Sequence, residues 1–414
     1  MTDIAPPHLA PLLMIPGPVE VSPEVLAAFS VPPPGHTAPA LVEAFGASLE
    51  SMRRVWSAEP ASQPFVIGGG GTAAMDMAVA NLVAAGDRVL VVKTGYFSDR
   101  LAEMLRRQGA ATVEVAAAPG DAPDLEAVRE ALAGQPSGGR CTALFATHVD
   151  TSTGVRIDPE PLARLAREHG MLSVFDGVCA TAGETFDMAG WDADVYLTGS
   201  QKALGLPPGL ALMVVSARAL AARAARRGPP PPMYLDWEVW QPVLRAYEER
   251  RAAYFSTPPT NLILALAAGL AAIEAEGVAP RIARHHQAAR ALRAAWRALG
   301  LGLLPVRDDL AANTLSAIRL PDSPSDAPAP ALVARIAAHG VTVAGGLLPD
   351  LKNSYFRIGH MGWVIGRPDL LRRTVTAVAA ALRDCGLALP APGAASGDAE
   401  RQALAALDDL PVRS

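Results

Sequence analysis

Short apolar segments alternate with amphipathic segments of helical period between residues 65 and 175, and this alternation constrains the fold more than any other feature. Apolar runs separated by helices are typical of βαβ units, in which helices cover both faces of a parallel sheet. We therefore expect an α/β fold with a doubly wound, mostly parallel sheet. The predicted strands are 65–67, 88–92, 112–115, 143–147 and 172–175, and the predicted helices are 41–56, 72–83, 98–108, 125–132 and 159–169.

The pattern changes after this region. Predicted strands 195–197 and 210–215 are separated by a gap too short for a helical crossover, so one of them is expected to be antiparallel. Two long helices, 260–275 and 279–299, precede further strands at 315–320, 342–343 and 355–359 and helices at 329–339 and 368–385. These segments predict a smaller C-terminal α/β domain. We predict an irregular segment at 1–40, a large domain at 41–275, the small domain at 276–388, and a linker with a peripheral tail at 389–414.

Composition favours a protein that acts on small molecules. The net charge of −5 and the lack of long Lys/Arg runs give no indication of nucleic acid or of an anionic membrane as a partner. The apolar stretch 252–273 contains two prolines and an asparagine, so it is interpreted as a buried helix and not as a membrane span. The N-terminus does not have the pattern of a secretory signal, and cytoplasmic residence is the default expectation. The histidines lack metal-ligand spacing; His285 and His286 are interpreted as solvated, and no metal is predicted.

Four consecutive glycines, 68–71, stand between a predicted strand and a predicted helix and are followed by Thr72 and Ala73. Backbone N–H groups at such a helix start favour a phosphate. The stretch also matches G-x-G-x-x-A, the fingerprint of dinucleotide enzymes. That alternative expects an acidic residue at the end of the next strand, where this chain has Lys93 and Thr94. A third interpretation is a tight turn without a ligand.

Asp176 follows an apolar strand and so lies at the carboxyl edge of the predicted sheet, where ligands bind in open α/β folds. Lys202 comes later in the segment Gly199-Ser200-Gln201-Lys202-Ala203. Either residue alone could be structural. Together with an upstream phosphate loop they form the set that pyridoxal-phosphate (PLP) chemistry requires, namely a phosphate anchor, a partner for the pyridine nitrogen and a Schiff-base lysine.

These residues belong to a longer ordered set of motifs. The set resembles the class V branch of the fold-type-I PLP-dependent aminotransferases, and most closely the alanine:glyoxylate (serine:pyruvate) aminotransferases. The resemblance covers nearly the whole globular chain. It is carried by Ile15-Pro16-Gly17-Pro18, Gly35-His36-Thr37, Ser62-Gln63-Pro64-Phe65, residues 94–100, residues 147–153, Gly199-Ser200-Gln201-Lys202-Ala203, Tyr254-Phe255-Ser256-Thr257-Pro258-Pro259, Ala344-Gly345-Gly346 and residues 357–362.

The resemblance implies PLP as the cofactor. It makes Lys202 the Schiff-base lysine, which also carries the proton between the substrate Cα and the cofactor, and Asp176 the partner of the ring nitrogen. Its further cofactor contacts are Gly70, Gly71, Thr72 and Gln201 at the phosphate, Phe97 and Val178 on the two faces of the ring, and Thr151 near the ring oxygen.

The resemblance also implies how substrates and subunits come together. It makes Arg357 the residue that binds the substrate carboxylate, because a guanidinium fork suits that group, and it places Gly17 of the N-terminal segment beside the substrate. Tyr254 and Thr257 match positions that reach the phosphate from the neighbouring subunit, which implies a homodimer with shared active sites. Judged without the resemblance, Arg357 could pair with an acidic residue, and residues 254–260 would be a structural loop.

The implied activity is a two-step ping-pong transfer of an amino group from a small L-amino acid, alanine or serine, to glyoxylate or pyruvate. An aminotransferase specialised for a biosynthetic pathway would share every motif. A cysteine desulfurase or lyase of the same fold would need a nucleophilic cysteine on an exposed loop. None of the cysteines has such a context: Cys141 and Cys179 lie in apolar segments and are predicted to be core residues, and Cys385 ends a predicted helix.

Overall fold

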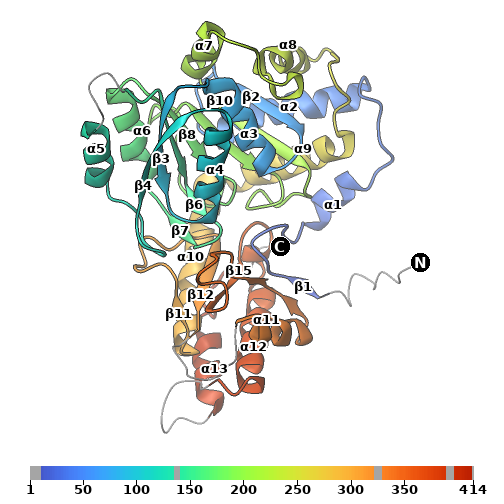
Figure 1. Cartoon of the computed structure of the whole chain (residues 1–414). Coiled ribbons are helices and arrows are strands. Elements are labelled where there is room, and N and C mark those ends of the chain that lie inside the picture. Colours follow the sequence, from blue (N-terminus) through green and yellow to red (C-terminus); the bar gives the residue numbers. More distant parts are fainter. Residues whose placement is uncertain (1–10, 135–139, 321–328, 388–395, 413–414) are drawn as a thin grey trace.

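The computed structural model describes residues 11–134, 140–320, 329–387 and 396–412, which fold into two lobes (Figure 1). The larger lobe is built on a seven-stranded sheet with the order β2-β10-β9-β8-β5-β3-β4. Its strands lie close to the predicted positions, and the expected α/β fold with a mostly parallel sheet is confirmed. The strands are β2 (Gln63–Gly68), β3 (Arg88–Lys93), β4 (Ala111–Ala116), β5 (Ala143–Thr147), β8 (Leu172–Asp176), β9 (Val195–Gly199) and β10 (Leu210–Val215).

One strand of this sheet runs against the others. β10 is antiparallel to both of its neighbours, β9 and β2, as the short gap around Lys202 predicts. The remaining pairs are parallel. Because β2 and β9 are both antiparallel to β10, they run in the same direction as each other. The carboxyl ends of β2, β3, β5, β8 and β9 therefore meet at one edge of the sheet.

Helices with one apolar face cover this sheet. α3 (Gly71–Leu82) packs on β9 and β10, α4 (Tyr96–Arg107) on β3 and β4, and α6 (Pro159–Glu168) on β5 and β8. Asp158 caps α6 by accepting a hydrogen bond from the Glu160 N–H, which fixes where that helix starts. α2 (Pro39–Val55) and α9 (Thr260–Glu276) pack against each other, α1 (Pro23–Phe29) lies on α9, and α5 (Leu125–Ala133) lies beside β4.

The segment after β10 contains helices that we did not predict. The sequence indicated only a stiff proline stretch at 228–232, but the structure has α7 (Ala217–Ala225), a 3₁₀ turn η1 (Met233–Leu235) and α8 (Trp237–Glu248). α8 continues through Pro242, a residue that disfavours a helix interior. Burial of Trp237, Trp240 and Tyr247 on one side of the helix compensates for that cost.

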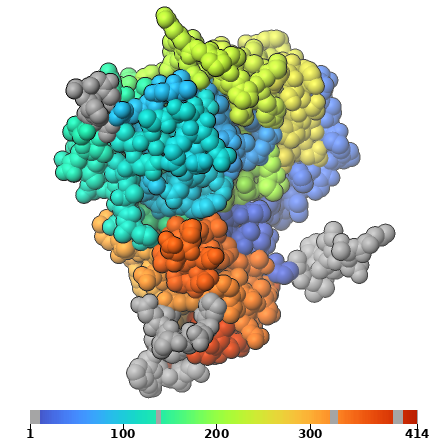
Figure 2. Space-filling model, in the orientation of Figure 1, coloured from blue at the N-terminus to red at the C-terminus, as the bar shows by residue number. Residues whose placement is uncertain are grey.

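The smaller lobe holds a four-stranded antiparallel sheet, β11 (Gly302–Leu303), β12 (Leu315–Arg319), β15 (Tyr355–Gly359) and β14 (Ala344–Gly345). α10 (Val278–Ala298), α11 (Ala329–Ala338), α12 (Pro368–Asp384) and a 3₁₀ turn η2 (Val364–Gly366) accompany it. The expected C-terminal α/β unit is therefore present, and it has its own apolar core. Figure 2 shows this orange and red lobe directly against the cyan part of the larger lobe. The exact domain bounds stay a prediction.

The ends of the described chain also belong to the smaller lobe. The predicted strand at 342–343 lies one residue earlier, as β13 (Val341–Thr342), and pairs in parallel with β1 (Leu12–Leu13) instead of joining the sheet. α13 (Ser396–Ala405) packs on α10 and α12, and Ala403 and Leu407 are buried there. The predicted linker falls largely on residues 388–395, outside the described part.

A membrane span was considered for the apolar helices. Among the described residues, no single helix is long and apolar enough to cross a membrane. α9 and α10 together reach that length and hydropathy, but they are bent by 86° at the break between them.

Candidate active site

The shared sheet edge brings the sequence-predicted residues together. Thr147 and Asp176 are register partners at the ends of β5 and β8, and Asp176 is also the partner of Leu197 in β9. Lys202 follows the end of β9 directly. Residues that are distant in the sequence therefore converge, as the topology of an open α/β sheet predicts.

The glycine loop connects β2 to α3, and neighbouring atoms lie so close to it that a side chain at these glycines would clash. A Cβ on Gly71 would lie 2.5 Å from Val178 Cγ2, and a Cβ on Gly199 would lie 2.8 Å from the Gly71 nitrogen. No side chain caps α3 at Gly70. The first N–H groups of the helix thus face the sheet edge, with the positive end of the helix dipole, and are suited to bind an anion.

Gln201 lies against this helix start. Its Nε2 is 3.8 Å from the position that a Cβ on Gly70 would take, and its buried Oε1 has no hydrogen-bond partner among the described residues. Thr72 is exposed at the first turn of α3, and Arg100 donates to its hydroxyl over 3.4 Å. The phosphate-site residues named by the resemblance therefore form one group around the α3 N-terminus.

Asp176 is a buried carboxylate with an unusual pKa. Burial raises the pKa of Asp176 to about 7, opposed by the Val178 N–H, which donates to Oδ1 over 2.9 Å. The charge of Asp150 raises this pKa further and that of Lys202 lowers it. A cation placed against this carboxylate would favour its ionised form.

Lys202 reaches the same region from a tightly held loop. Its Nζ donates to the Pro16 carbonyl of the N-terminal segment, and Gly17 sits so close that a Cβ there would lie 2.4 Å from Lys202 Cδ. Burial lowers the pKa of Lys202, which favours the neutral, nucleophilic amine. Arg281 of α10 braces the loop by donating to the Ala203 carbonyl over 2.7 Å.

Phe97 lies in the first turn of α4, and the buried carboxylate of Asp150 holds this helix start in place. Asp150 Oδ2 accepts from the N–H groups of Phe97 and Ser98 at 3.2 and 3.1 Å, and its Oδ1 accepts from the Ser152 hydroxyl at 2.6 Å. Sequence reasoning did not give Asp150 this role. The available signal was an acidic residue after the β5 strand, which could serve the N-terminus of a neighbouring helix.

Arg357 projects from β15 of the smaller lobe toward this edge. Its Nε donates to the Gly345 carbonyl over 2.9 Å and its Nη1 to the Thr151 carbonyl over 3.1 Å. The guanidinium is mostly buried, and the ion pairs seen in the described part of the chain do not include it. His360, three residues on, is buried and bonded to Ser316, and burial lowers its pKa to about 3, so it is a neutral packing residue.

Two predicted residues lie apart from the others. Tyr254 and Thr257 are on the exposed loop between α8 and α9; their hydroxyls are 3.5 Å apart, and the Tyr254 ring lies 5.2 Å from that of His36. Tyr254 is 62% exposed. The remaining eleven site residues gather at the sheet edge or line its approaches within this single chain.

Comparisons with known proteins agree with this geometry. The profile described as "Aminotransferase class-V" matches residues 41–316. The chain belongs to the class V aminotransferase family. Alanine–glyoxylate aminotransferase 1 of Saccharomyces cerevisiae is 35% identical over 363 residues, covering 84% of this chain and 91% of the yeast protein. An L-aspartate–glyoxylate aminotransferase of Paracoccus denitrificans is 33% identical, covering 84% of this chain and 86% of that protein.

A solved structure supports the same assignment. The alanine–glyoxylate aminotransferase of Nostoc sp. has a TM-score of 0.83 and 32% identity, and the match covers 92% of this chain and 97% of that one. This class V aminotransferase therefore has the fold-type-I architecture and is a PLP-dependent transaminase. The resemblance stated from the sequence is confirmed.

The chain's own residues fit this cofactor. The uncapped start of α3 suits the phosphate of PLP. Burial raises the pKa of Asp176, so its ionised form needs a positive partner such as a protonated ring nitrogen. Burial lowers the pKa of Lys202, so its neutral amine suits the aldehyde carbon. Gln201 leaves a buried polar atom without a partner next to that helix start.

The alternatives fit less well. Cys141 and Cys179 are buried, as predicted, so neither is on an exposed loop as a desulfurase requires. Cys385 ends α12 in the smaller lobe. A dinucleotide enzyme would carry an acidic residue at the end of β3. This chain has Lys93 there, which pairs with Asp99 and Glu114 at 2.7 and 2.9 Å.

Proposed function

We propose that this class V aminotransferase moves the amino group of a small L-amino acid, alanine or serine, to a small 2-oxo acid, glyoxylate or pyruvate, in a two-step ping-pong reaction. The names of the relatives support the acceptor, since both curated relatives described above act on glyoxylate. The donor is supported less strongly, because alanine appears in one name and aspartate in the other. An aminotransferase specialised for a biosynthetic pathway is the alternative.

The observation that carries this proposal is the position of Arg357, which is held on the Thr151 carbonyl and is near enough to Lys202 for its charge to lower the lysine pKa. Two donors of Arg357 are fixed on backbone carbonyls, which orients the guanidinium, and no carboxylate of the described chain pairs with it. A buried, oriented guanidinium without a counter-ion is suited to bind the carboxylate that amino acids and 2-oxo acids share. It thereby places the substrate Cα near the lysine.

The residue roles in this proposal are those that the resemblance implies, and the positions of the residues are consistent with them. When bound, PLP supplies a carbonyl carbon that condenses with amines and a ring that accepts electrons from the substrate Cα–H bond. Lys202 holds the proton that moves to and from Cα. Asp176 would keep the ring nitrogen positive, and the α3 N-terminus with Gly70, Gly71, Thr72 and Gln201 would bind the phosphate. Phe97 and Val178 would confine the ring, and Thr151 would lie near its oxygen.

We also propose a homodimer in which Tyr254 and Thr257 complete the phosphate site of the neighbouring subunit. The support is their exposure: both lie on a loop away from the sheet edge, and Met233, Tyr234 and Leu26 are further large apolar side chains exposed on the same lobe. Exposed apolar side chains often mark an interface. Cytoplasmic residence stays a prediction from the sequence.

A donor and acceptor screen tests the function. Purified enzyme should lose its yellow colour with L-alanine and regain it with glyoxylate, and both half-reactions should proceed with the isolated enzyme. L-serine and L-aspartate serve as competing donors, with pyruvate as the competing acceptor. An enzyme that keeps its colour with every small amino acid would contradict the proposal, and faster turnover with a larger or dicarboxylic donor would favour the specialised alternative.

Borohydride reduction tests the lysine assignment. The full chain has only three lysines, Lys93, Lys202 and Lys352, so peptide mapping has few possible outcomes. We expect the reduced cofactor on Lys202, because it alone of the three is buried. Attachment at Lys93 or Lys352 would contradict the assignment.

A further inference from the structure

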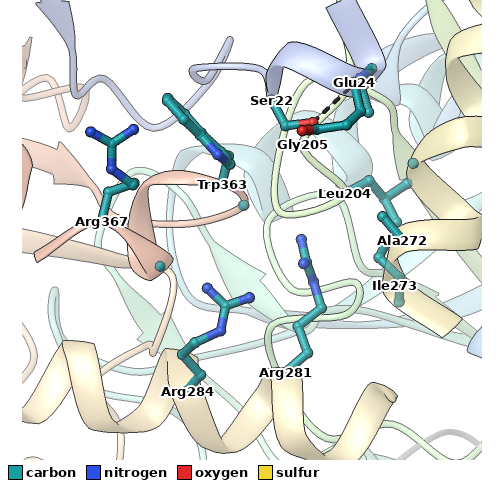
Figure 3. A pocket seen from close by; sticks show the side chains of 14 residues that line it. Ser22, Glu24, Leu204, Gly205, Ala272, Ile273, Arg281, Arg284, Trp363 and Arg367 are labelled. Atoms are coloured by element: carbon teal, nitrogen blue, oxygen red, sulfur yellow. Dashed lines mark hydrogen bonds between the residues drawn. The ribbon is translucent and has the colours of Figure 1, made fainter. Parts of the chain in front are cut away.

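A cavity of about 230 Å³ lies behind the loop that carries Lys202, separate from the sheet edge (Figure 3). Its walls come from four places: the start of α1, the loop residues Leu204 and Gly205, one side of the α9–α10 corner, and the turn at η2. The volume exceeds the roughly 30 Å³ that a water molecule occupies in the liquid, so there is room for a small organic molecule. Neither the mechanism nor the cofactor uses this cavity.

Two arginines reach into the cavity from α10. Arg281 and Arg284 are three residues apart, so they share one face of the helix; Figure 3 shows Arg281 rising toward Leu204 and Arg284 rising below Trp363. Both pair with the same carboxylate, Glu276, at 3.2 and 2.6 Å. Arg284 binds Glu276 through two donors, Nε and Nη2, each over 2.8 Å.

Arg284 has donor capacity left over. Its Nη1 is buried and has no hydrogen-bond partner among the residues that the structure describes. A buried donor without an acceptor carries a desolvation cost, which an anion in the cavity would relieve. Arg367 adds a third guanidinium at the rim, where it pairs with Asp369 at 2.7 Å and lies over the Trp363 ring at 5.0 Å. Glu24, on the opposite rim, is exposed and solvated.

The rest of the wall is apolar. Val25, Leu204 and Ile273 are buried side chains that line the cavity, together with Gly269 and Ala272. Oriented guanidinium donors on one side and aliphatic side chains on another match a molecule with a carboxylate head and a short apolar tail. We propose that this cavity is a second binding site, for a small aliphatic carboxylate held by the free Nη1 donor of Arg284.

The site is joined to the catalytic loop. Arg281 donates to the Ala203 carbonyl, next to Lys202. Gly205 of the cavity wall packs closely on Gly362: a Cβ on Gly362 would lie 3.2 Å from the Gly205 Cα. A bound carboxylate therefore contacts the segment that positions Lys202 without entering the substrate site.

Calorimetry on the PLP-loaded enzyme tests the site, with butyrate as the first probe and inorganic phosphate as the second. We expect butyrate to bind in the millimolar range or tighter, and Arg284→Gln to weaken this binding at least about tenfold, because a charge-assisted donor is lost. Arg290→Gln changes an exposed arginine of the same helix and should leave binding within about twofold of the unchanged protein.

A second pair of variants tests the space without altering charge. Ala272→Phe would fill the cavity and abolish butyrate binding. Ala271→Phe, at the preceding exposed position of α9, which does not line the cavity, should not. This pair keeps the test decisive even if Arg284→Gln does not fold. Arg357→Gln removes the proposed substrate anchor and should leave butyrate binding at the cavity intact.

Several results would overturn the proposal. These are an absence of butyrate binding to the Arg357→Gln protein, or binding that survives both Arg284→Gln and Ala272→Phe when each is combined with Arg357→Gln. Tighter binding of phosphate than of butyrate would overturn the assignment to an aliphatic carboxylate, because the apolar wall would then contribute nothing. These outcomes do not depend on which amino donor the enzyme uses.

Discussion

Lys202 is distinguished from the two other lysines by its surroundings. Burial lowers its pKa, whereas Lys93 is held in two ion pairs and Lys352 is exposed. We expect Lys202→Ala to reduce transamination at least about a thousandfold, because the variant loses the general acid and base. Steady-state assays with alanine and glyoxylate measure this effect. Lys352→Ala is the control and should keep full activity; equal losses in both variants would contradict the role of Lys202.

The pKa of Asp176 predicts how the stability of the cofactor-free protein depends on pH. Burial raises the folded-state pKa from 3.8 to about 7, so the folded chain binds this proton more tightly than the unfolded chain. The resulting stability is fully present below pH 3.8 and is lost as the pH rises through about 7. Asp176→Asn cannot lose a proton and lacks this dependence.

Urea unfolding of both cofactor-free proteins at pH 5 and pH 8 tests this expectation. Between these values the free energy of unfolding of the unchanged protein should fall relative to that of Asp176→Asn by a few kcal/mol. Burial also raises the pKa of Glu184 to about 7, but Glu184 is present in both proteins and its effect cancels. If the free energy of unfolding changes equally with pH in both proteins, Asp176 does not have a raised pKa in the folded protein and the prediction is wrong.

Arg357 is expected to act on substrate binding. Arg357→Gln should lower kcat/KM about 10- to 100-fold, because charge-assisted hydrogen bonds contribute roughly 1.5–3 kcal/mol. Most of the change should appear in KM for both the amino acid and the 2-oxo acid, since both carry the carboxylate. Arg335→Gln, at an exposed position of α11, is the matched control. An unchanged KM for both substrates would exclude Arg357 as the anchor.

Among single residues, the sequence identified those expected to contact cofactor or substrate, but it missed those that hold other parts of the site in place. Lys202, Asp176 and Arg357 were identified because motifs and strand ends mark them. Asp150 and His285 were not. His285 was interpreted as solvated, but it is fully buried, accepts from the Gly362 N–H over 3.3 Å and contacts the Arg281 carbonyl through Nδ1. That interpretation is wrong because the burial comes from the turn before η2, which periodicity along α10 cannot reveal.

Among the elements, the start of α3 depends on a glycine at position 71. Gly71→Ala would force a Cβ to within 2.5 Å of Val178, and overpacking of this kind costs about 1–3 kcal/mol. We expect a lower melting temperature and cofactor binding weakened by about tenfold or more, since α3 must shift at its N-terminus. Adding Val178→Ala should restore part of both losses, because the clash is with the valine methyls.

The control for this prediction is Gly302→Ala in β11, where an added Cβ meets its nearest neighbour at 3.9 Å, an ordinary contact. Thermal unfolding and a cofactor titration measure the three variants, Gly71→Ala, Gly71→Ala/Val178→Ala and Gly302→Ala. If Val178→Ala gives no rescue of Gly71→Ala, the glycine is required for its backbone and not for the space beside it.

Helices and strands were predicted well wherever the spacing of apolar residues and the turn residues on either side indicate the same element. The strands of the larger lobe and the antiparallel β10 are confirmed because their spacing leaves few other arrangements. α8 was missed because Pro242 interrupts the local signal, and burial of tryptophans overrides it. The pairing of β13 with β1 was not foreseen, because two short segments more than 300 residues apart carry no local mark of their contact.

For the whole molecule, shared active sites predict complementation between inactive variants. Lys202→Ala and Tyr254→Ala homodimers should each be impaired; after unfolding and refolding together, a mixed dimer would regain one site with both native residues. Random pairing of equal amounts then gives about a quarter of the full activity. Assays before and after mixing measure this recovery, and a Lys202→Ala/Tyr254→Ala double variant mixed with Lys202→Ala should recover nothing. Absence of recovery despite proven mixed dimers would place Tyr254 outside the neighbouring site.

The N-terminal segment connects the two lobes with very little chain. Leu12 and Leu13 are paired with β13, the Met14 carbonyl accepts from the Gly359 N–H over 2.8 Å, and Pro16 and Gly17 already touch Lys202. Only Ile15 lies between Met14, which is bonded to β15, and Pro16, which is bonded to Lys202, so the two contacts are separated by very little chain. If the smaller lobe swings toward a bound substrate, it would pull the Pro16 carbonyl from the lysine amine. Lobe movement and release of that amine would then be one mechanical event.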